Sequence, residues 1–172
     1  MMARVYWIEG PWTGRLAIVP RPRGGDWLDD EVSGWRESGI DVVVSFLTIE
    51  EAAEFALENE GELSKAHGIR FVSFPIPDQQ VPLSKQAAVA LLHDLEEALV
   101  EGKTVAVHCR QSVGRSATVA AALLVSEGED PRVAFEKIEK ARGCKVPETA
   151  EQERWVRNFA LELATLPALH SR

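Results

Sequence analysis

A thiol and a guanidinium lie close together in the stretch VAVHCRQSVGRSATVAAALL, residues 105–124. Cys109 and Arg115 are six residues apart, with an apolar run before them and an Ala-rich run after them. A strand that ends at His108 and a helix that begins near Arg115 leave a loop whose backbone amides can converge on one anion. The positive end of the helix dipole points at the same place. The spacing therefore predicts a phosphate-binding loop.

The side chains of this loop suit an attack on phosphorus. A thiol in the field of a helix N-terminus ionises readily, so Cys109 is the candidate nucleophile. The planar guanidinium of Arg115 can hold two phosphoryl oxygens at once. Ser112 and Gly114 are small enough to let the backbone approach a ligand. The alternative is a buried structural cysteine with an arginine nearby by chance, and the full pattern of strand, His-Cys, Gly-Arg-Ser and helix argues against it.

The run HCRQSVGRS, residues 108–116, resembles the H-C-x5-R-[ST] signature of the cysteine-dependent protein tyrosine phosphatases. The chain length resembles that of their compact dual-specificity branch. This resemblance implies that Cys109 is the nucleophile and that Ser116 helps the thiolate to leave. It also implies that His108 orients the loop and tunes the thiolate. The implied phosphoryl-binding residues are His108, Arg110, Gln111, Ser112, Val113, Gly114 and Arg115.

Asp78 is the candidate general acid for the departing oxygen. It lies in FPIPDQQVP, residues 74–82, on a proline-stiffened loop that follows a predicted strand. A plain surface turn is the alternative, because Pro-Asp is ordinary turn chemistry. The position of Asp78, with one helix between it and Cys109, resembles the mobile acid loop of the family and favours the catalytic role.

The stretch VPETAEQERW, residues 146–155, resembles the family element that positions the hydrolytic water. In this resemblance Gln152 holds the water, and Thr149 lies three residues before it. The chain departs from the family at Glu148, where related members often carry a further glutamine. The alternative for this stretch is a solvated polar face on the last helix.

Three further residues stand out near these motifs. Arg21 and Arg23 lie in an early loop that related phosphatases place beside the pocket, so they are candidates for steering an anionic substrate. A solvated loop is the alternative for both. Cys144 has Ala150 six residues on and cannot head a second loop of this kind. A structural role is favoured for Cys144 over that of a resolving partner for oxidised Cys109.

Length and composition limit the number of domains, the classes of partner and the cellular compartment. The chain has 172 residues, 45% of them hydrophobic, so we expect one domain over residues 1–172. A net charge of -8 argues against binding to nucleic acid or anionic membranes. The sequence has no signal-peptide pattern, no stretch of about 20 apolar residues, and no cysteine pairing or zinc spacing. We therefore expect a cytoplasmic monomer that needs no metal or other cofactor.

The predicted elements alternate between strands and helices. Strands are expected over residues 5–8, 16–19, 42–46, 71–74 and 104–108, and the first two are expected to form a hairpin. Helices are expected over residues 26–37, from Ser84 to before Gly102, from Pro131, and from Pro147 to about Leu166. This alternation predicts an α/β fold with a mostly parallel central sheet of about five strands flanked by helices, as in the dual-specificity phosphatases.

These features favour a metal-independent phosphomonoester hydrolase that acts on phosphotyrosine proteins or peptides through a cysteinyl-phosphate. Phosphoserine and phosphothreonine are further candidate substrates. One alternative is a phosphatase of phosphoinositides, inositol phosphates or RNA 5′-phosphates. Members for lipid and inositol substrates resemble HC-K-x-x-K, whereas this loop has Arg110 and Val113 at those lysine positions. Another alternative is a catalytically inactive module that binds phosphoresidues, which intact Cys109, Arg115 and Asp78 argue against.

Overall fold

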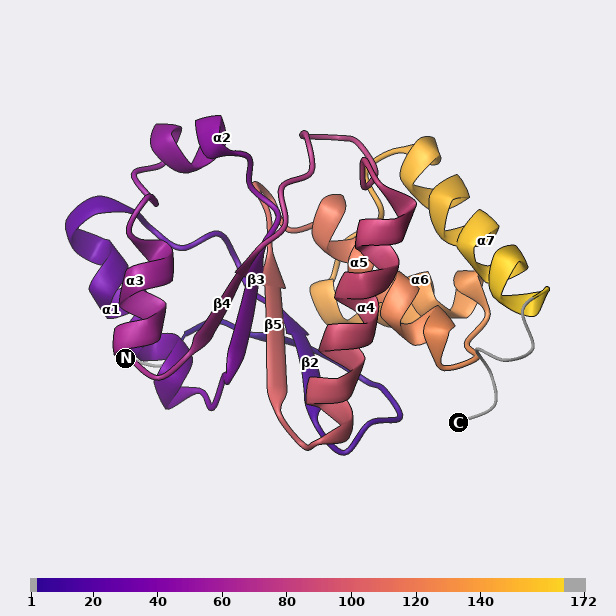
Figure 1. Cartoon of the computed structure of the whole chain (residues 1–172), viewed down its shortest axis with the longest axis horizontal. Helices are drawn as coiled ribbons and strands as arrows, with labels where there is room; N and C mark the ends of the chain where they lie inside the picture. The colour runs from indigo at the N-terminus through magenta and orange to yellow at the C-terminus, as the bar shows by residue number, and fades with distance from the viewer. Residues whose placement is uncertain (1–2, 166–172) are drawn as a thin grey trace.

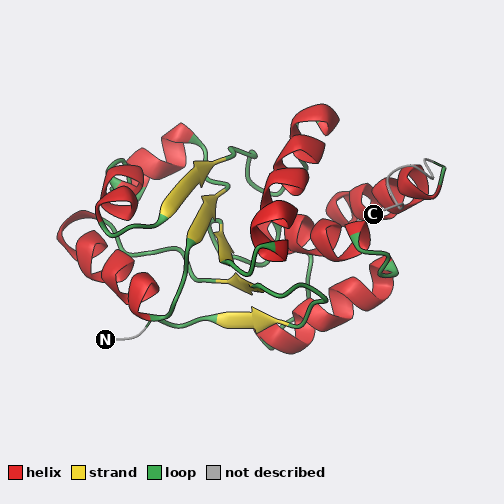
Figure 2. Ribbon diagram, turned by 60° about the horizontal axis from the view of Figure 1, so that its bottom comes forward, coloured by secondary structure: helices red, strands yellow, loops and turns green. Residues whose placement is uncertain are grey.

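The computed structural model describes residues 3–165 and shows a five-stranded sheet with helices on both faces (Figures 1 and 2). The strands lie in the order β1-β2-β5-β3-β4, and only the β1–β2 pair is antiparallel. Their bounds are β1 Tyr6–Ile8, β2 Arg15–Ile18, β3 Val42–Ser45, β4 Arg70–Ser73 and β5 Thr104–His108. The predicted strands and the predicted hairpin are confirmed to within one residue at each end.

Seven α-helices connect and follow the strands within the described residues. They are α1 Leu28–Glu37, α2 Ile49–Glu54, α3 Glu60–Ala66, α4 Lys85–Val100, α5 Arg115–Ser126, α6 Pro131–Arg142 and α7 Ala150–Ala164. A short 3-10 helix, Gly25–Trp27, precedes α1 and accounts for the start of the helix expected over residues 26–37. None of the helices in residues 3–165 is long and apolar enough to cross a membrane.

The sheet has a hydrophobic cluster on each face, because successive side chains of a strand point to opposite sides. In β3, Val42 and Val44 join the larger cluster and Val43 joins the smaller one. Helices α4, α5, α6 and α7 cover the face of the larger cluster, whereas α1 and α3 cover the other (Figure 1). The fold class expected from the alternation of strands and helices is therefore confirmed.

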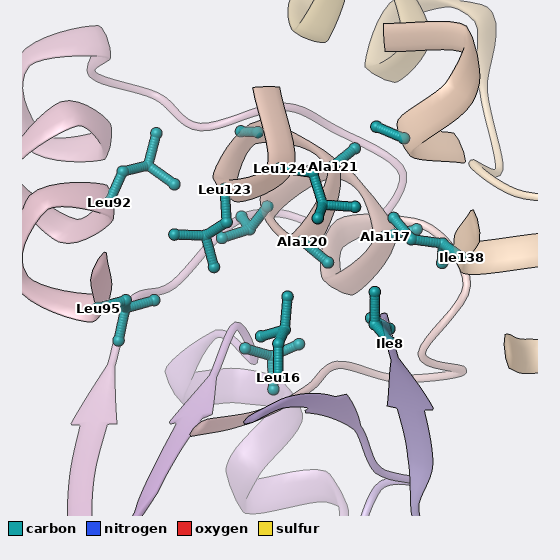
Figure 3. Packing of buried hydrophobic residues seen from close by; sticks show 14 of the residues in the cluster. Ile8, Leu16, Leu92, Leu95, Ala117, Ala120, Ala121, Leu123, Leu124 and Ile138 are labelled. Atoms are coloured by element: carbon teal, nitrogen blue, oxygen red, sulfur yellow. The ribbon is translucent and has the colours of Figure 1, made fainter. Parts of the chain in front are cut away.

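Helix α5 is the central helix of the larger cluster. Eleven of its twelve residues are buried, because the sheet and the neighbouring helices α4, α6 and α7 surround it. In Figure 3, Leu123 of α5 lies on the side of Leu92 and Leu95 of α4, whereas Ala117 of α5 lies beside Ile138 of α6. A helix held on all sides has a fixed N-terminus, and that N-terminus carries the loop after β5.

Two helices begin where the sequence predicted, and each has a side-chain cap. Ser84 caps α4, since its hydroxyl accepts a hydrogen bond from the amide of Ala87 at 3.1 Å. Asp130 caps α6 and Pro131 occupies its first position. These caps confirm the predicted starts of both helices.

The last helix begins later than expected. Its first residue is Ala150 rather than Pro147, because Thr149 and Gln152 form a reciprocal capping box at that point. Each of these two side chains accepts a hydrogen bond from the backbone amide of the other residue, at 3.1 Å. The expected end of the helix, near Leu166, lies outside the described residues.

Candidate active site

Residues 109–114 form a loop between β5 and α5, at the carboxyl-terminal edge of the parallel strands. β5 is the middle strand of the sheet and ends at His108, and Gly114 is the N-cap residue of α5. Cys109 follows the strand directly, and only 2% of its surface is exposed. Ligands of parallel α/β sheets bind at this edge, so the loop has the position predicted for an anion site.

The loop backbone presents amides that have no other partner. Within residues 3–165, the amides of residues 110–114 donate none of the hydrogen bonds in the structure. Ser112 has a left-handed backbone with φ of 59°, which reverses the chain and helps successive amides to converge. Its hydroxyl donates to the carbonyl of Val19 at 2.8 Å and accepts from the amide of Cys109 at 3.4 Å. Ser112 thus attaches the loop to the segment that follows β2.

Arg115 is buried and has a fully determined orientation. Its Nη1 and Nη2 donate to the two carboxylate oxygens of Glu51 at 2.7 and 2.9 Å. Nη1 also donates to the carbonyls of Ile76 at 2.7 Å and Phe46 at 3.3 Å. Nη2 donates in addition to Oδ1 of Asp78 at 3.1 Å. The predicted guanidinium and the predicted acid therefore meet in the structure.

Glu51 is a site residue that no functional motif marked in the sequence. Its only signal was the T-x-x-E spacing from Thr48, and the structure shows both hydrogen bonds of this capping box at the start of α2. Burial raises the pKa of Glu51, but hydrogen bonds from Arg115 and Thr48 have the larger combined effect and lower the pKa to about 2. Burial lowers the pKa of Arg115, but the bond to Glu51 and the charge of a Cys109 thiolate raise it more. Both groups therefore stay charged, and the guanidinium keeps one orientation.

Asp78 lies on the loop between β4 and α4, and 43% of its side chain is exposed. Its two oxygens face two arginines, with Oδ1 3.1 Å from Arg115 and Oδ2 3.6 Å from Nε of Arg110. Ile76 anchors this loop, because its side chain is fully buried and its carbonyl binds Arg115. The amide of Gln80 closes a turn on the carbonyl of Pro77 at 3.0 Å. The loop thus holds a carboxyl beside Arg115.

Two buried polar residues flank the loop. His108 has no exposed surface, and its Nε2 lies 2.6 Å from a carboxylate oxygen of Glu60 on α3. Its ring centroid is 5.9 Å from that of Trp35. Ser116, in the first turn of α5, is fully buried, and its hydroxyl has no hydrogen-bond partner among the described residues. His108 is therefore fixed by groups from helices α1 and α3, while the hydroxyl of Ser116 can still donate.

Gln152 joins three segments of the site. Its side-chain oxygen accepts from the amides of Glu148 and Thr149, both at 3.1 Å, and its Nε2 donates to the carbonyl of Gln80 at 3.1 Å. A Cβ atom built on Gly114 would lie 2.7 Å from the Glu148 carboxylate and 3.1 Å from Nε2 of Gln152. Gln152 therefore packs against both the loop of Cys109 and the loop of Asp78, and Gly114 provides the space for this approach.

The two early arginines differ in their contacts. Nη1 of Arg21 donates to the carbonyl of Arg110 at 3.0 Å, and its guanidinium lies 3.6 Å from the ring centroid of Phe55. Arg23 instead binds Glu31 at 2.6 Å. The structure therefore brings Arg21 to the loop and pairs Arg23 with α1.

Arg142, at the end of α6, also contacts the loop, and no sequence pattern marked it. Its Nε donates to the carbonyl of Ser112 at 3.1 Å, and its Nη2 donates to the carbonyl of Gln111 at 3.3 Å. Its guanidinium lies 4.2 Å from the ring centroid of Tyr6. Cys144, two residues further on, is exposed and forms no disulfide in the described part of the chain.

Residues 19–129 match the family model described as "Tc-R-P: Polymorphic toxin system, DSP-PTPase phosphatase". This range contains Asp78, Cys109 and Arg115. Cyclin-dependent kinase inhibitor 3 of Rattus norvegicus is 29% identical over 131 residues, which are 75% of this chain and 61% of that protein. The protein of the same name from Homo sapiens is 27% identical over 131 residues and has the same coverage. The chain therefore spans less than two thirds of the length of these curated relatives.

Two solved structures are similar over nearly the whole chain. One is kinase associated phosphatase with a serine in place of its catalytic-site cysteine, with a TM-score of 0.87 and 21% identity, covering 95% of this chain and 97% of that one. The other is Tk-PTP in its active form, with a TM-score of 0.74 and 28% identity, covering 94% of this chain and 99% of that one. The first likeness establishes only the fold, because 21% identity is too low to transfer a function.

Proposed function

Because the chain belongs to this family of DSP-PTPase phosphatases, we propose that it hydrolyses phosphotyrosine in proteins, with phosphoserine and phosphothreonine as further candidate substrates. One observation carries the proposal, namely the arrangement of residues 109–115. There a buried thiol, a fixed guanidinium and a row of backbone amides with no acceptor among residues 3–165 surround one point at the N-terminus of α5. Such a site suits a phosphoryl dianion and an attacking sulfur.

In the first step, the thiolate of Cys109 attacks phosphorus in line. The S–P bond forms while the bond from phosphorus to the substrate oxygen breaks, which gives a cysteinyl-phosphate. The amides of residues 110–114 and Arg115 stabilise the charge on the three equatorial oxygens. Glu51 already holds both Nη atoms of Arg115, so the guanidinium reaches the transition state without reorienting.

Asp78 protonates the departing oxygen in the same step. Oδ1 of Asp78 accepts a hydrogen bond from Nη2 of Arg115, a donor that an incoming phosphoryl group also needs. Nε of Arg115 donates no hydrogen bond within residues 3–165, so it is a second donor for the substrate. An incoming phosphoryl group that binds Nη2 releases Asp78 from Arg115 and leaves its carboxyl beside the departing oxygen. The acid is thereby supplied where the leaving group departs.

In the second step, water hydrolyses the cysteinyl-phosphate. Asp78, now a carboxylate, takes a proton from the water. At the same time the water oxygen bonds to phosphorus and the S–P bond breaks. The hydroxyl of Ser116, which has no partner among the described residues, donates to the sulfur as it leaves. Gln152 lies against Gly114 and donates to the carbonyl of Gln80, and this position between the two loops supports a role for its amide in holding the water.

The same proposal includes the setting of the enzyme. Residues 1–172 form one phosphatase domain that works as a cytoplasmic monomer and binds neither nucleic acid nor membranes. A single sheet carrying both hydrophobic clusters supports one domain. The net charge of -8 disfavours polyanionic partners, and two free cysteines suit a reducing compartment.

The substrate is tested with the full chain in the presence of a chelator. Initial rates are measured on peptides with phosphotyrosine, phosphothreonine or phosphoserine, and on phosphoinositides, inositol phosphates and RNA 5′-phosphates. We expect phosphotyrosine peptides to have the highest kcat/KM and the chelator to have no effect. Faster turnover of a non-protein phosphate would contradict the proposed substrate. Phosphopeptide binding without release of phosphate would instead identify a binding module.

Replacing Asp78 by asparagine tests its role as the acid. Asp78→Asn should slow hydrolysis of a phosphotyrosine peptide by roughly 100-fold, since a basic phenolate leaves poorly without a proton. An aryl phosphate with a strongly acidic phenol should be slowed much less, because that phenol departs as its anion. The measurement is kcat for both substrates, with Asp30→Asn, an exposed carboxylate of α1, as the control. An equal loss for both leaving groups would assign Asp78 a structural role in its loop.

A further inference from the structure

The carbonyls of the loop after Cys109 have an unusual set of donors. Three consecutive carbonyls, those of residues 110–112, accept hydrogen bonds from two arginine side chains that lie far from them in the sequence. Nη1 of Arg21 binds the carbonyl of Arg110 at 3.0 Å. Arg142 binds the next two, Gln111 through Nη2 at 3.3 Å and Ser112 through Nε at 3.1 Å. The outer side of the loop is thus held by charged donors from both flanks.

Each of these carbonyls fixes the amide that follows it. A peptide unit is planar and trans, so its C=O and its N–H point in opposite directions. The carbonyls of Arg110, Gln111 and Ser112 share their planes with the amides of Gln111, Ser112 and Val113. A carbonyl held on the outside therefore turns the next amide toward the inside. If the carbonyl lost its donor, the plane could rotate and the amide would leave the anion site.

Both arginines are themselves held in place by aromatic rings. The guanidinium of Arg21 lies 3.6 Å from the ring centroid of Phe55, in the segment after α2. That of Arg142 lies 4.2 Å from the ring centroid of Tyr6 in β1. Contacts of a cation with a ring face are attractive and restrict the side chain. The donors are thus pre-oriented from two separate parts of the fold.

We propose that Arg142 and Arg21 are positioning residues that keep the amides of Gln111, Ser112 and Val113 turned toward the phosphoryl group. The proposal rests on the proposed function, because that function supplies the anion. Neither arginine touches the substrate, so both act through the backbone of the loop. Arg142 has the larger effect, since it holds two peptide planes and Arg21 holds one.

The two arginines differ in how well a lysine can replace them. Arg142 uses two nitrogens of its fork on two different carbonyls, a geometry that one ammonium cannot reproduce. Arg21 uses a single nitrogen on a single carbonyl, so a lysine can in principle make the same bond. Long-range attraction between positive charge and the substrate would predict equal rescue by lysine at both positions. The lysine variants therefore separate positioning from charge.

The experiment uses the full chain with Arg142→Ala, Arg142→Lys, Arg21→Ala and Arg21→Lys. The control is Lys140→Ala, which removes an exposed charge from the same turn of α6. Binding of inorganic phosphate is measured by calorimetry, kcat and KM are measured on a phosphotyrosine peptide, and thermal unfolding is followed without phosphate. Arg142→Ala should weaken phosphate binding and lower kcat/KM by roughly 10- to 100-fold, as expected for hydrogen bonds to a charged ligand. Arg142→Lys should stay close to Arg142→Ala, and Lys140→Ala should stay close to the wild type. Arg21→Ala should also weaken phosphate binding, and Arg21→Lys should restore most of that loss.

The outcomes distinguish the two proposals. If the wild type is active and Arg142→Lys equals it in phosphate binding and in kcat/KM, the positioning role is overturned. The proposed function is then left intact. A wild type that binds phosphate but hydrolyses no phosphopeptide overturns the proposed function, while the phosphate affinities still decide the role of Arg142. If Arg142→Ala does not fold, the comparison of Arg142→Lys with the wild type tests the positioning role by itself. Weaker phosphate binding by this variant at an unchanged unfolding temperature supports positioning.

Discussion

Replacing Cys109 by serine should lower turnover of a phosphotyrosine peptide by at least about 10,000-fold while leaving phosphate binding in place. A hydroxyl is far less ionised than a thiol at neutral pH, so the attacking anion is lost. The groups that bind the phosphoryl oxygens stay, since Arg115 and the loop amides are unchanged. Steady-state kinetics measure the loss of turnover, and calorimetry with inorganic phosphate measures the retained binding.

Cys144→Ser is the matched control, because it makes the same chemical change at an exposed cysteine. This variant should keep wild-type turnover. In the wild type, rapid acid quenching followed by mass spectrometry should detect phosphate on the peptide that contains Cys109. Substantial turnover by Cys109→Ser, or phosphate trapped on another residue, would contradict the covalent mechanism.

Replacing Arg115 by lysine should lower kcat/KM by roughly 100- to 1,000-fold, although the charge is kept. The guanidinium binds both oxygens of Glu51 and the carbonyl of Ile76, while its Nε donates no hydrogen bond within residues 3–165 and is left for a phosphoryl oxygen. A lysine has its donors on one atom and cannot serve Glu51 and two phosphoryl oxygens together. Glu51 would then lose the paired hydrogen bonds that it accepts from the buried guanidinium, so the free energy of unfolding should fall as well.

The measurements for Arg115→Lys are kcat/KM on a phosphotyrosine peptide and denaturant unfolding with and without phosphate. Arg132→Lys is the control, since that side chain is exposed and pairs with Glu136 one turn later in α6. A folded Arg115→Lys enzyme within about tenfold of wild-type kcat/KM would show that positive charge alone suffices at this position.

The phosphate loop could be predicted from the sequence because it depends on short stretches of chain. A strand, a six-residue turn and a helix place Cys109 and Arg115 at one helix N-terminus whatever the rest of the fold does. The strands and the starts of α4 and α6 were also predictable, since side-chain period and capping are local properties. The start of α7 was predicted too early, because the proline signal at Pro147 lies before the capping box of Thr149.

Family resemblance extended the prediction to Asp78 and Gln152, and the structure places both beside the loop. Their distance from Cys109 along the chain gives no local signal, so only the resemblance could associate them with it. The structure adds that Asp78 accepts a hydrogen bond from Arg115. It also shows that Gln152 caps α7 and binds the acid loop at the same time.

The sequence by itself determined the candidate nucleophile, the candidate phosphate-binding loop and the order of strands and helices along the chain. Only the tertiary structure decided which distant groups support that loop. Glu51, Glu60 and Arg142 became part of the site because the sheet order places β5 between β2 and β3 and the helices pack around it. Such contacts join residues far apart in sequence, and neither period nor composition encodes them. The same packing selects Arg21 over Arg23, two residues that the sequence could not tell apart.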